Sequence, residues 1–244
     1  MKLMEKILSK ENLQIAIKKV KQNKGAPGVD KMTVDEVETW FEQYQEEVMS
    51  KIMNKQYRPM PVKRVYIPKE NGKLIPLGIP AVVDRVIQHA IAQVMSTIYE
   101  PLFSEHSFGF RPNRSAHMVM EEVLNNLNEG YEWIIDLDIE KFFDKVNHDK
   151  LISILRGNVK DTTTLHLIRA YLRAGVLDNG LIKSTEVGMP QGGPISVILS
   201  NVYLDKFDKE LESRNLRFSR YCDDRIIFVK SEMSANRVMK SVTW

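Results

Sequence analysis

The amino-acid sequence predicts an α+β fold in which helices pack on antiparallel sheet. Apolar residues recur at helical spacing in several segments, and other segments show hydrophobic runs on both sides of short turn signals, as β-hairpins do. Helices mixed with hairpins are typical of this class. The chain has 244 residues, of which 43% are hydrophobic and 27% charged, so it can bury a core as one domain or as two small lobes.

The N-terminal part predicts two amphipathic helices. Residues 10–24 carry apolar side chains at i, i+3, i+4 and i+7 spacing, and the loop that follows is rich in glycine and proline. Thr33 and Glu36 have the spacing of a capping box, which predicts a second helix with an apolar stripe that ends at Ile52.

Residues 62–80 predict a hairpin whose two short strands flank an Asn71-Gly72 turn. The overlapping stretch 51–73 holds seven bases against the single acid Glu70. Such a strip suits a surface that faces phosphates, although a solvated surface explains it equally well. The bases are Lys51, Lys55, Arg58, Lys63, Arg64, Lys69 and Lys73.

Further elements follow in order. Asp84 and Ser115 are candidate N-caps of two helices with apolar stripes. Residues 131–144 alternate so that a strand there would direct Asp136 and Asp138 to one face and apolar side chains to the other. The remaining pattern predicts helices over 147–156, 161–173 and 196–214, and a hairpin over 216–231.

The hairpin over 216–231 places Asp223 and Asp224 side by side at its tip. Adjacent carboxylates raise each other's pKa unless water, donors or a cation hold them ionised. A solvent-exposed turn is the plain interpretation, but the run from Ile226 to Val229 has the continuous hydrophobicity of a strand buried on both faces. The tip is therefore expected to lie on a sheet within the fold.

Asp138 supplies a third carboxylate at the end of a second strand. Three carboxylates at one spot provide the hard oxygen ligands that Mg²⁺ prefers. Two such ions about 3.5–4 Å apart can activate a 3′-hydroxyl and stabilise a leaving pyrophosphate, which is nucleotidyl transfer. The spacing does not match a Ca²⁺ loop, and the histidines form no short-spaced pair for zinc, so Cys222 is interpreted as a core or turn residue.

A lone cysteine excludes an internal disulfide and fits a reducing compartment. The sequence shows no signal peptide, and no apolar run approaches the length of a membrane span. We therefore expect no membrane partner. The net charge of +3 permits an anionic partner without requiring one.

Six sequence blocks, in order along the chain, resemble those of the reverse transcriptase and maturase proteins encoded by bacterial group II introns. The resemblance implies fingers and palm of a right-hand polymerase, with the N-terminal extension and fingers in residues 1–130 and the palm in residues 131–244. It also implies a location in the bacterial cytoplasm. The blocks are "NKGAPGVDKMT" (23–33), "YIPKENGKLIPLGIPAVVDRVIQ" (66–88), "SFGFRPNRSAH" (107–117), "DLDIEKFFDKVNHDKL" (136–151), "GMPQGGPISVILSNVYLDKFDKEL" (188–211) and "RYCDD" (220–224).

Matched residue by residue, the resemblance implies a catalytic trio of Asp138, Asp223 and Asp224. These residues, with the carbonyl of Ile139, would hold two Mg²⁺ ions, for which Mn²⁺ is a possible substitute. For the other sites it implies Lys69 at the triphosphate, Phe143 at the sugar, Gln191 near the incoming nucleotide, and Arg64, Arg111 and Arg114 at template phosphates. Without the resemblance, Phe143 could be a core residue, Lys69 an exposed hairpin lysine, and each arginine the partner of a surface acid.

The implied function is RNA-directed DNA synthesis, with intron RNA as template, a DNA primer and deoxynucleoside triphosphates as partners. Ile75 stands where the family has an arginine that helps Lys69, which leaves the nucleotide affinity open. The chain stops one helix after the acidic hairpin, so thumb, maturase and endonuclease domains are expected to be absent and the fragment weak or inactive. The apolar palm surface exposed in this way predicts a homodimer. The alternatives are an RNA-binding maturase platform and, less favoured, a palm-fold nucleotide cyclase.

Overall fold

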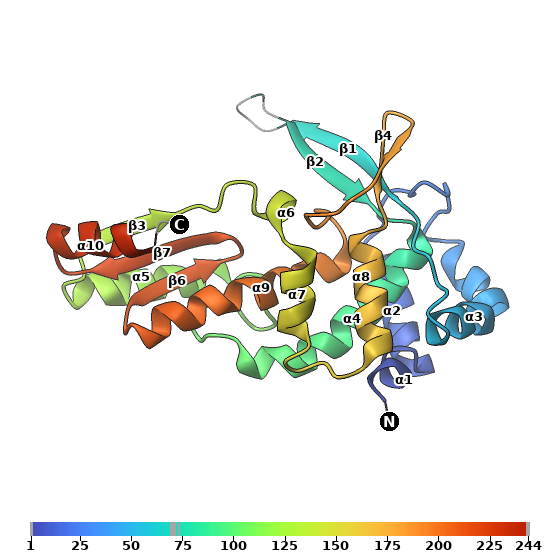
Figure 1. Ribbon diagram of the computed structural model, residues 1–244, viewed down its shortest axis with the longest axis horizontal. Helices are drawn as coiled ribbons and strands as arrows, with labels where there is room; N and C mark the ends of the chain where they lie inside the picture. Colours follow the sequence, from blue (N-terminus) through green and yellow to red (C-terminus); the bar gives the residue numbers. More distant parts are fainter. Residues whose placement is uncertain (1, 69–71, 73, 243–244) are drawn as a thin grey trace. The chain divides into compact units, whose positions relative to one another are not determined.

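The computed structural model describes residues 2–68, 72 and 74–242 (Figure 1). Its helices and strands confirm the predicted α+β class. They fall into two compact units, one made of Met1–Ile98 and Phe143–Leu199, the other of Tyr99–Phe142 and Ser200–Trp244. These units alternate along the chain, whereas the predicted division is a single cut after residue 130. The assignment of fingers and palm to those two halves stays a prediction.

The first unit combines helices with a sheet in the order β2-β1-β4-β5. Strands β1 and β2 form the predicted antiparallel hairpin, and its turn at 69–71 and 73 lies outside the described residues. Strand β1 also pairs in parallel with β4. The elements are α1 (Leu3–Ile7), α2 (Lys10–Gln22), α3 (Val37–Met53), β1 (Val62–Pro68), β2 (Leu74–Ile79), most of α4 (Val82–Tyr99), α6 (Phe142–Lys145), α7 (His148–Leu155), α8 (Thr162–Leu172), β4 (Val176–Asp178), β5 (Leu181–Lys183) and the start of α9 (Pro194–Ser213).

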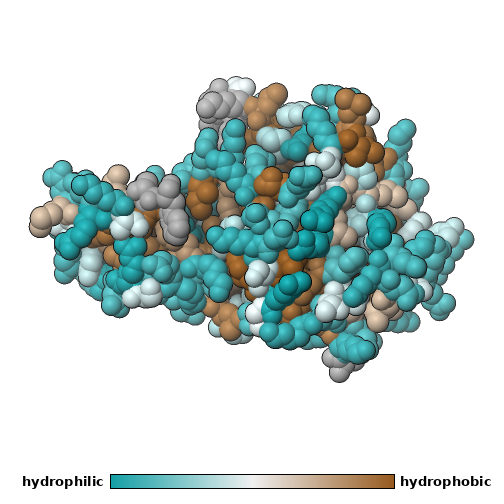
Figure 2. Space-filling model, in the orientation of Figure 1, coloured by the Kyte–Doolittle hydropathy of each residue, from teal (hydrophilic) through white to brown (hydrophobic). Residues whose placement is uncertain are grey.

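Helix α4 supplies much of the first unit's core, since its apolar residues from Val82 to Met95 are almost inaccessible. The side chain of Asn12 in α2 donates to the carbonyl of Ala90 at 2.9 Å and so ties α2 to α4. By contrast, hydrophobic side chains are exposed at the outer ends of the two hairpins of the sheet, where Figure 2 shows brown surface. The exposed residues there are Ile67, Leu74, Leu181 and Ile182.

Three local predictions differ from the structure. Asp84 is not an N-cap, because it lies inside α4 with its buried carboxylate accepting from the Tyr57 hydroxyl (2.8 Å) and the Met60 amide (3.0 Å). Thr33 donates its hydroxyl to Glu36 instead of accepting from an amide, and α3 begins only at Val37. The β4–β5 hairpin was not predicted, although its Asn179-Gly180 turn carries the same signal as Asn71-Gly72.

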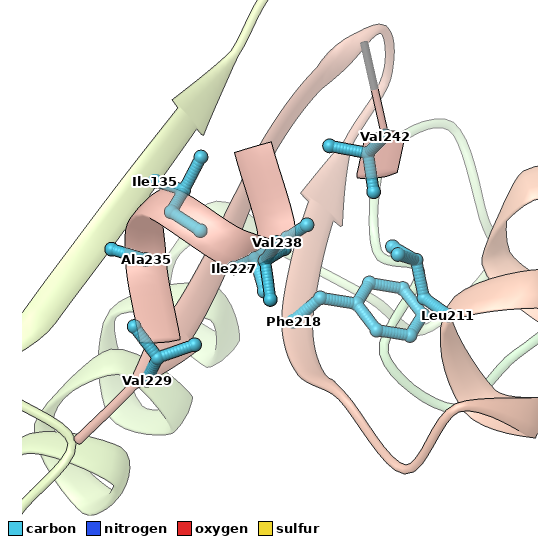
Figure 3. Packing of buried hydrophobic residues seen from close by; sticks show 8 residues of the cluster. All are labelled: Ile135, Leu211, Phe218, Ile227, Val229, Ala235, Val238 and Val242. Carbon is cyan, nitrogen blue, oxygen red and sulfur yellow. The ribbon is translucent and has the colours of Figure 1, made fainter. Parts of the chain in front are cut away.

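The second unit is built around a sheet in the order β3-β7-β6. The central strand β7 is buried from Ile227 to Val229, as its hydrophobicity predicts. Ile135, Ile227 and Phe218 pack with side chains of α9 and α10 in one core (Figure 3). The elements are η1 (Glu100–Leu102), α5 (Ala116–Asn128), β3 (Trp133–Leu137), the rest of α9, β6 (Arg217–Tyr221), β7 (Asp224–Val229) and α10 (Glu232–Val242).

Among the described residues, none of the helices combines the length and the apolar character needed to cross a bilayer.

Candidate active site

Strands β3 and β7 bring the predicted acidic residues to one end of the sheet. Their antiparallel register pairs Leu137 with Arg225. Asp138 follows Leu137 directly and Asp224 is the first residue of β7, so this register, continued by one residue, would place the two opposite each other. Side chains of directly opposed residues lie on the same face with Cβ atoms about 4.5–5.5 Å apart. Asp223 precedes Asp224 in the turn of the β6–β7 hairpin (Figure 1), so the fold gathers all three positions.

The pKa of Asp224 reflects the neighbouring carboxylates. Desolvation raises the pKa of the Asp224 carboxyl above its ordinary value, and the negative charges of Asp223, Asp138 and Asp136 raise that pKa further. A carboxyl whose ionisation is opposed by three neighbouring carboxylates gains most from a nearby cation. The alternation in residues 131–144 predicts Asp136 on this face, with no role at the site.

The donor set fits Mg²⁺, although the side chains do not converge on a point. Within 2–68, 72 and 74–242, no three histidine, cysteine, aspartate or glutamate side chains are grouped closely enough to hold a metal ion. The mutual repulsion of the carboxylates opposes such grouping. The carbonyl of Ile139 accepts from the Phe142 amide at 3.1 Å, and a carbonyl keeps a second lone pair for another partner. Carboxylate and carbonyl oxygens are the ligands that Mg²⁺ takes.

The turn that carries Asp223 is as short as a hairpin allows. Tyr221 and Asp224 are paired, so the loop contains only Cys222 and Asp223. Cys222 has φ +60, a left-handed conformation that non-glycine residues adopt at a cost. Burial, followed by the charge of Asp223, raises the pKa of its thiol to about 11. The thiol is therefore protonated at neutral pH. Cys222 lies in the turn, which is one of the two places predicted for it.

A segment from the "SFGFRPNRSAH" block braces this turn. Residues 106–108 run beside β6, with the Arg220 amide donating to the His106 carbonyl (2.8 Å) and the Phe108 amide donating to the Arg220 carbonyl (2.9 Å). The following residue, Gly109, lies so close to the turn that an added Cβ would be 2.1 Å from the Cys222 nitrogen. Only glycine fits there without displacing backbone.

The two predicted template arginines of this unit are engaged within the protein. The Arg111 side chain is 3% exposed and pairs with Glu100 at 2.8 Å. It also donates to the carbonyls of Ser104 and Ser107. This burial favours a structural role for Arg111 over a phosphate contact. Arg114 is partly exposed and pairs with Glu105, which lowers the pKa of that carboxyl.

The other predicted residues belong to the first unit. Arg64 lies half-buried in β1, and the Phe143 carbonyl accepts from the Met189 amide at 2.7 Å. The Gln191 carbonyl accepts from the Gly78 amide at 2.7 Å, which ties the "PQGG" loop to β2. Lys69 lies outside the described residues. The functional roles of all four stay predictions.

Two arginines that the sequence patterns did not single out flank the acidic turn. Arg220 and Arg225 are 0% and 1% exposed, and both pair with the buried Asp208 of α9. For Arg225 the signal is an arginine directly before the apolar run from Ile226 to Val229, because a buried charge must have a partner. Arg220 lies in the mixed strand β6, whose sequence carries no such signal. The identity of that partner depends on tertiary structure.

Comparison with known proteins identifies a matching family and several relatives. Residues 67–243 match the family described as reverse transcriptase (RNA-dependent DNA polymerase). The protein YkfC of Escherichia coli is 37% identical over 221 residues, which are 88% of this chain and 58% of that protein. The group II intron-encoded protein LtrA of Lactococcus lactis is 35% identical over 213 residues, covering 87% of this chain and 35% of that protein. Nuclear intron maturase 4 of Arabidopsis thaliana is 31% identical over 144 residues, 58% of this chain and 18% of that protein.

A solved structure, the partial Cas6-RT-Cas1–Cas2 complex, matches with a TM-score of 0.59 at 24% identity over 99% of this chain and 41% of that chain. This likeness supports the predicted fold class. The chain spans less than two thirds of the length of each of these proteins.

Proposed function

The chain belongs to the reverse transcriptase (RNA-dependent DNA polymerase) family, and from this membership we propose that it is the fingers and palm portion of a group II intron reverse transcriptase. In this proposal it copies intron RNA into DNA from a DNA primer and deoxynucleoside triphosphates, in the bacterial cytoplasm. The observation that carries the proposal is that β3 and β7 meet at one end of the sheet, where Asp138 follows the pair Leu137–Arg225 and Asp223 and Asp224 precede it.

The acidic trio has the role of holding two Mg²⁺ ions, which Mn²⁺ can replace, together with the carbonyl of Ile139. Bound ions of this kind lower the pKa of a 3′-hydroxyl and offset the charge of a leaving pyrophosphate. The raised pKa of Asp224 supports this role, because a carboxyl surrounded by like charges is ready to accept a cation as partner.

The residues of the first unit complete the proposal. Lys69 grips the triphosphate, Phe143 crowds the 2′ position of the sugar, and Gln191 approaches the incoming nucleotide. The hydrogen bond between the Gln191 carbonyl and β2 supports a fixed position for its loop. Arg64 and Arg114 are candidates for template phosphates, since neither side chain is buried.

The acidic trio is tested by changing both turn aspartates. We expect the double variant Asp223→Asn, Asp224→Asn in the intact protein to lose primer extension on an RNA template, because amides cannot offset the charge of two divalent ions. The matched control is Asp136→Asn, which changes a neighbouring carboxylate outside the trio. Unchanged primer extension by the double variant would refute the catalytic role of the acidic trio.

A second candidate function is RNA binding as a maturase platform. It is favoured by the excess of bases in residues 51–73. Among the described residues of this stretch, the exposed bases are Lys51, Lys55, Arg58 and Lys63. Affinity carried by phosphate contacts falls steeply with salt concentration. Filter binding of intron RNA between about 50 and about 200 mM salt tests this function. A flat response would argue against phosphate contacts.

A further inference from the structure

A buried ionic cluster lies directly behind the acidic turn. It consists of Asp208 of α9, Arg220 at the end of β6 and Arg225 in β7, which are 0%, 0% and 1% exposed. Arg220 and Arg225 are paired across the two strands, and their guanidinium groups reach Asp208 at 2.8 Å and 2.9 Å. The cluster therefore holds two positive charges against one negative charge.

Stability alone gives little reason for such a cluster. Buried ion pairs lose so much solvation that well-packed hydrophobic residues of similar volume often serve as well or better. The neighbouring positions of the same sheet face, Phe218 and Ile227, are indeed apolar and buried. The arginines instead lie at the end of the sheet that carries the acidic residues, where the direction of the carboxylates decides what they can bind.

Arg220 reaches the turn itself. Its Nη1 donates to the carbonyl of Cys222 at 2.8 Å, which is half of the peptide group that joins Cys222 to Asp223. Its Nε donates to Asp208 and its Nη2 to the Ser107 hydroxyl at 2.6 Å. A planar guanidinium with fixed donor directions can hold these partners in one geometry, which a lysine cannot.

Asn201 of α9 links Arg220 to the segment that braces the turn from the other side. Its Oδ1 accepts from Arg220 Nη1 at 2.8 Å, and its Nδ2 donates to the Gly109 carbonyl at 3.0 Å. Gly109 in turn abuts the backbone of Cys222. The two-residue loop is therefore held by a donor at its carbonyl and by backbone contact at its nitrogen.

We propose that Arg220 is a positioning residue for the reaction: it fixes the Cys222–Asp223 peptide group and so sets the direction of the Asp223 and Asp224 carboxylates. Asp208 and Asn201 hold the Arg220 guanidinium for this task. The proposal rests on the proposed function for its catalytic meaning, while the hold on the turn is a property of the protein alone.

Arg225 offers a matched comparison. It is as deeply buried as Arg220, shares the same Asp208 partner and lies over the Phe207 ring at 4.3 Å. Its hydrogen bond goes to Asp208 through Nη2, whereas Nε and Nη1 have no partner among the described residues. A lysine at either position keeps the charge. Comparing Arg220→Lys with Arg225→Lys therefore distinguishes loss of the Arg220 hydrogen bonds to the turn from a general disturbance of the core.

The first test is hydrogen exchange of the peptide 221–225 in the 244-residue chain without metal. We expect Arg220→Lys to speed exchange of these amides at least tenfold, a rough threshold for a lost local contact, and Arg225→Lys to leave them near the wild-type rate. Equal exchange in the two variants would overturn the inference. If Arg220→Lys does not fold, Asn201→Ala serves instead, and unchanged exchange in that variant would equally overturn it.

The second test is Mn²⁺ affinity measured by calorimetry. Loss of a group that orients metal ligands typically weakens binding about 10- to 100-fold, so Arg220→Lys is expected to weaken Mn²⁺ binding by that factor and Arg225→Lys by less than about twofold. The double variant Asp223→Asn, Asp224→Asn should bind no Mn²⁺. Full Mn²⁺ binding by that double variant would refute the metal site of the proposed function, whereas unaltered Mn²⁺ affinity in Arg220→Lys would refute only the positioning role.

Discussion

Adding one methyl group at Gly109 should disturb the acidic turn more than its size suggests. The new Cβ would lie 2.1 Å from the Cys222 nitrogen, and ordinary contact begins at 3.4 Å, so the two backbones must part by about 1.3 Å. Neither side can move freely, because Asn201 holds the Gly109 carbonyl and Arg220 holds the Cys222 carbonyl. The displacement is therefore passed to Asp223 and Asp224.

The expected magnitudes follow from this displacement. Overpacking of this kind costs roughly 1–3 kcal/mol in the free energy of unfolding. A misplacement of about 1 Å at a reacting centre can lower the rate by about 10²-fold. We therefore expect Gly109→Ala to lose about two orders of magnitude in the rate of single-nucleotide primer extension, while the protein stays folded.

The assay compares single-nucleotide extension on an RNA template with urea unfolding. The control is Gly130→Ala in the same unit, where φ is +82 and no atom lies within 4 Å of the added Cβ. That variant should lose roughly 1–2 kcal/mol of stability for its backbone conformation and keep its extension rate. Primer extension by Gly109→Ala at the wild-type rate, or equal impairment of both variants, would contradict the expected displacement of the turn.

Three further predictions concern stability and assembly. Burial raises the pKa of Asp84 to about 6, above its unfolded value, so the folded state binds this proton more tightly. The free energy of unfolding should therefore fall by about 3 kcal/mol through this group as the pH rises from about 3 to about 7. Urea unfolding of Asp84→Asn should lack that component, and an unchanged slope would contradict it. Gly192→Ala should lower the free energy of unfolding by roughly 2–5 kcal/mol, because φ is +105 and the added Cβ would lie 2.7 Å from the Gly78 carbonyl oxygen. Gly180→Ala, where φ is +81 and no atom lies within 4 Å of the added Cβ, should lower it by only roughly 1–2 kcal/mol in the same urea measurement. We also expect a homodimer, because Trp133 and Ile134 are exposed at the start of β3, the end away from the acidic residues. Light scattering that detects only monomer at high concentration would argue against it.

The sequence by itself determined the local elements and the acidic positions. Helices such as Lys10–Gln22 and strands such as Trp133–Leu137 follow from apolar spacing, because hydrogen bonding and burial within one element depend on residues close in the chain. The hairpin that carries Asp223 and Asp224 is equally local, since a turn and its two flanking strands need no distant partner to be recognised.

Only the tertiary structure decided which of these residues depend on one another. The parallel pairing of β1 with β4 joins residues more than a hundred positions apart, and no local pattern specifies it. Asp84 has the appearance of a cap in the sequence but serves as a buried acceptor, because Tyr57 and Met60 reach it from another segment.

The same holds around the acidic turn. The sequence shows a glycine at 109 and an arginine at 220, but their roles depend on the folded unit. Gly109 lies so close to Cys222 that an added Cβ would be 2.1 Å from the Cys222 nitrogen, and Arg220 donates to the Cys222 carbonyl at 2.8 Å. Short-range preferences thus fixed the positions of the carboxylates along the chain. Close packing, which excludes all but a few side chains at each buried point, decided what holds those carboxylates in place.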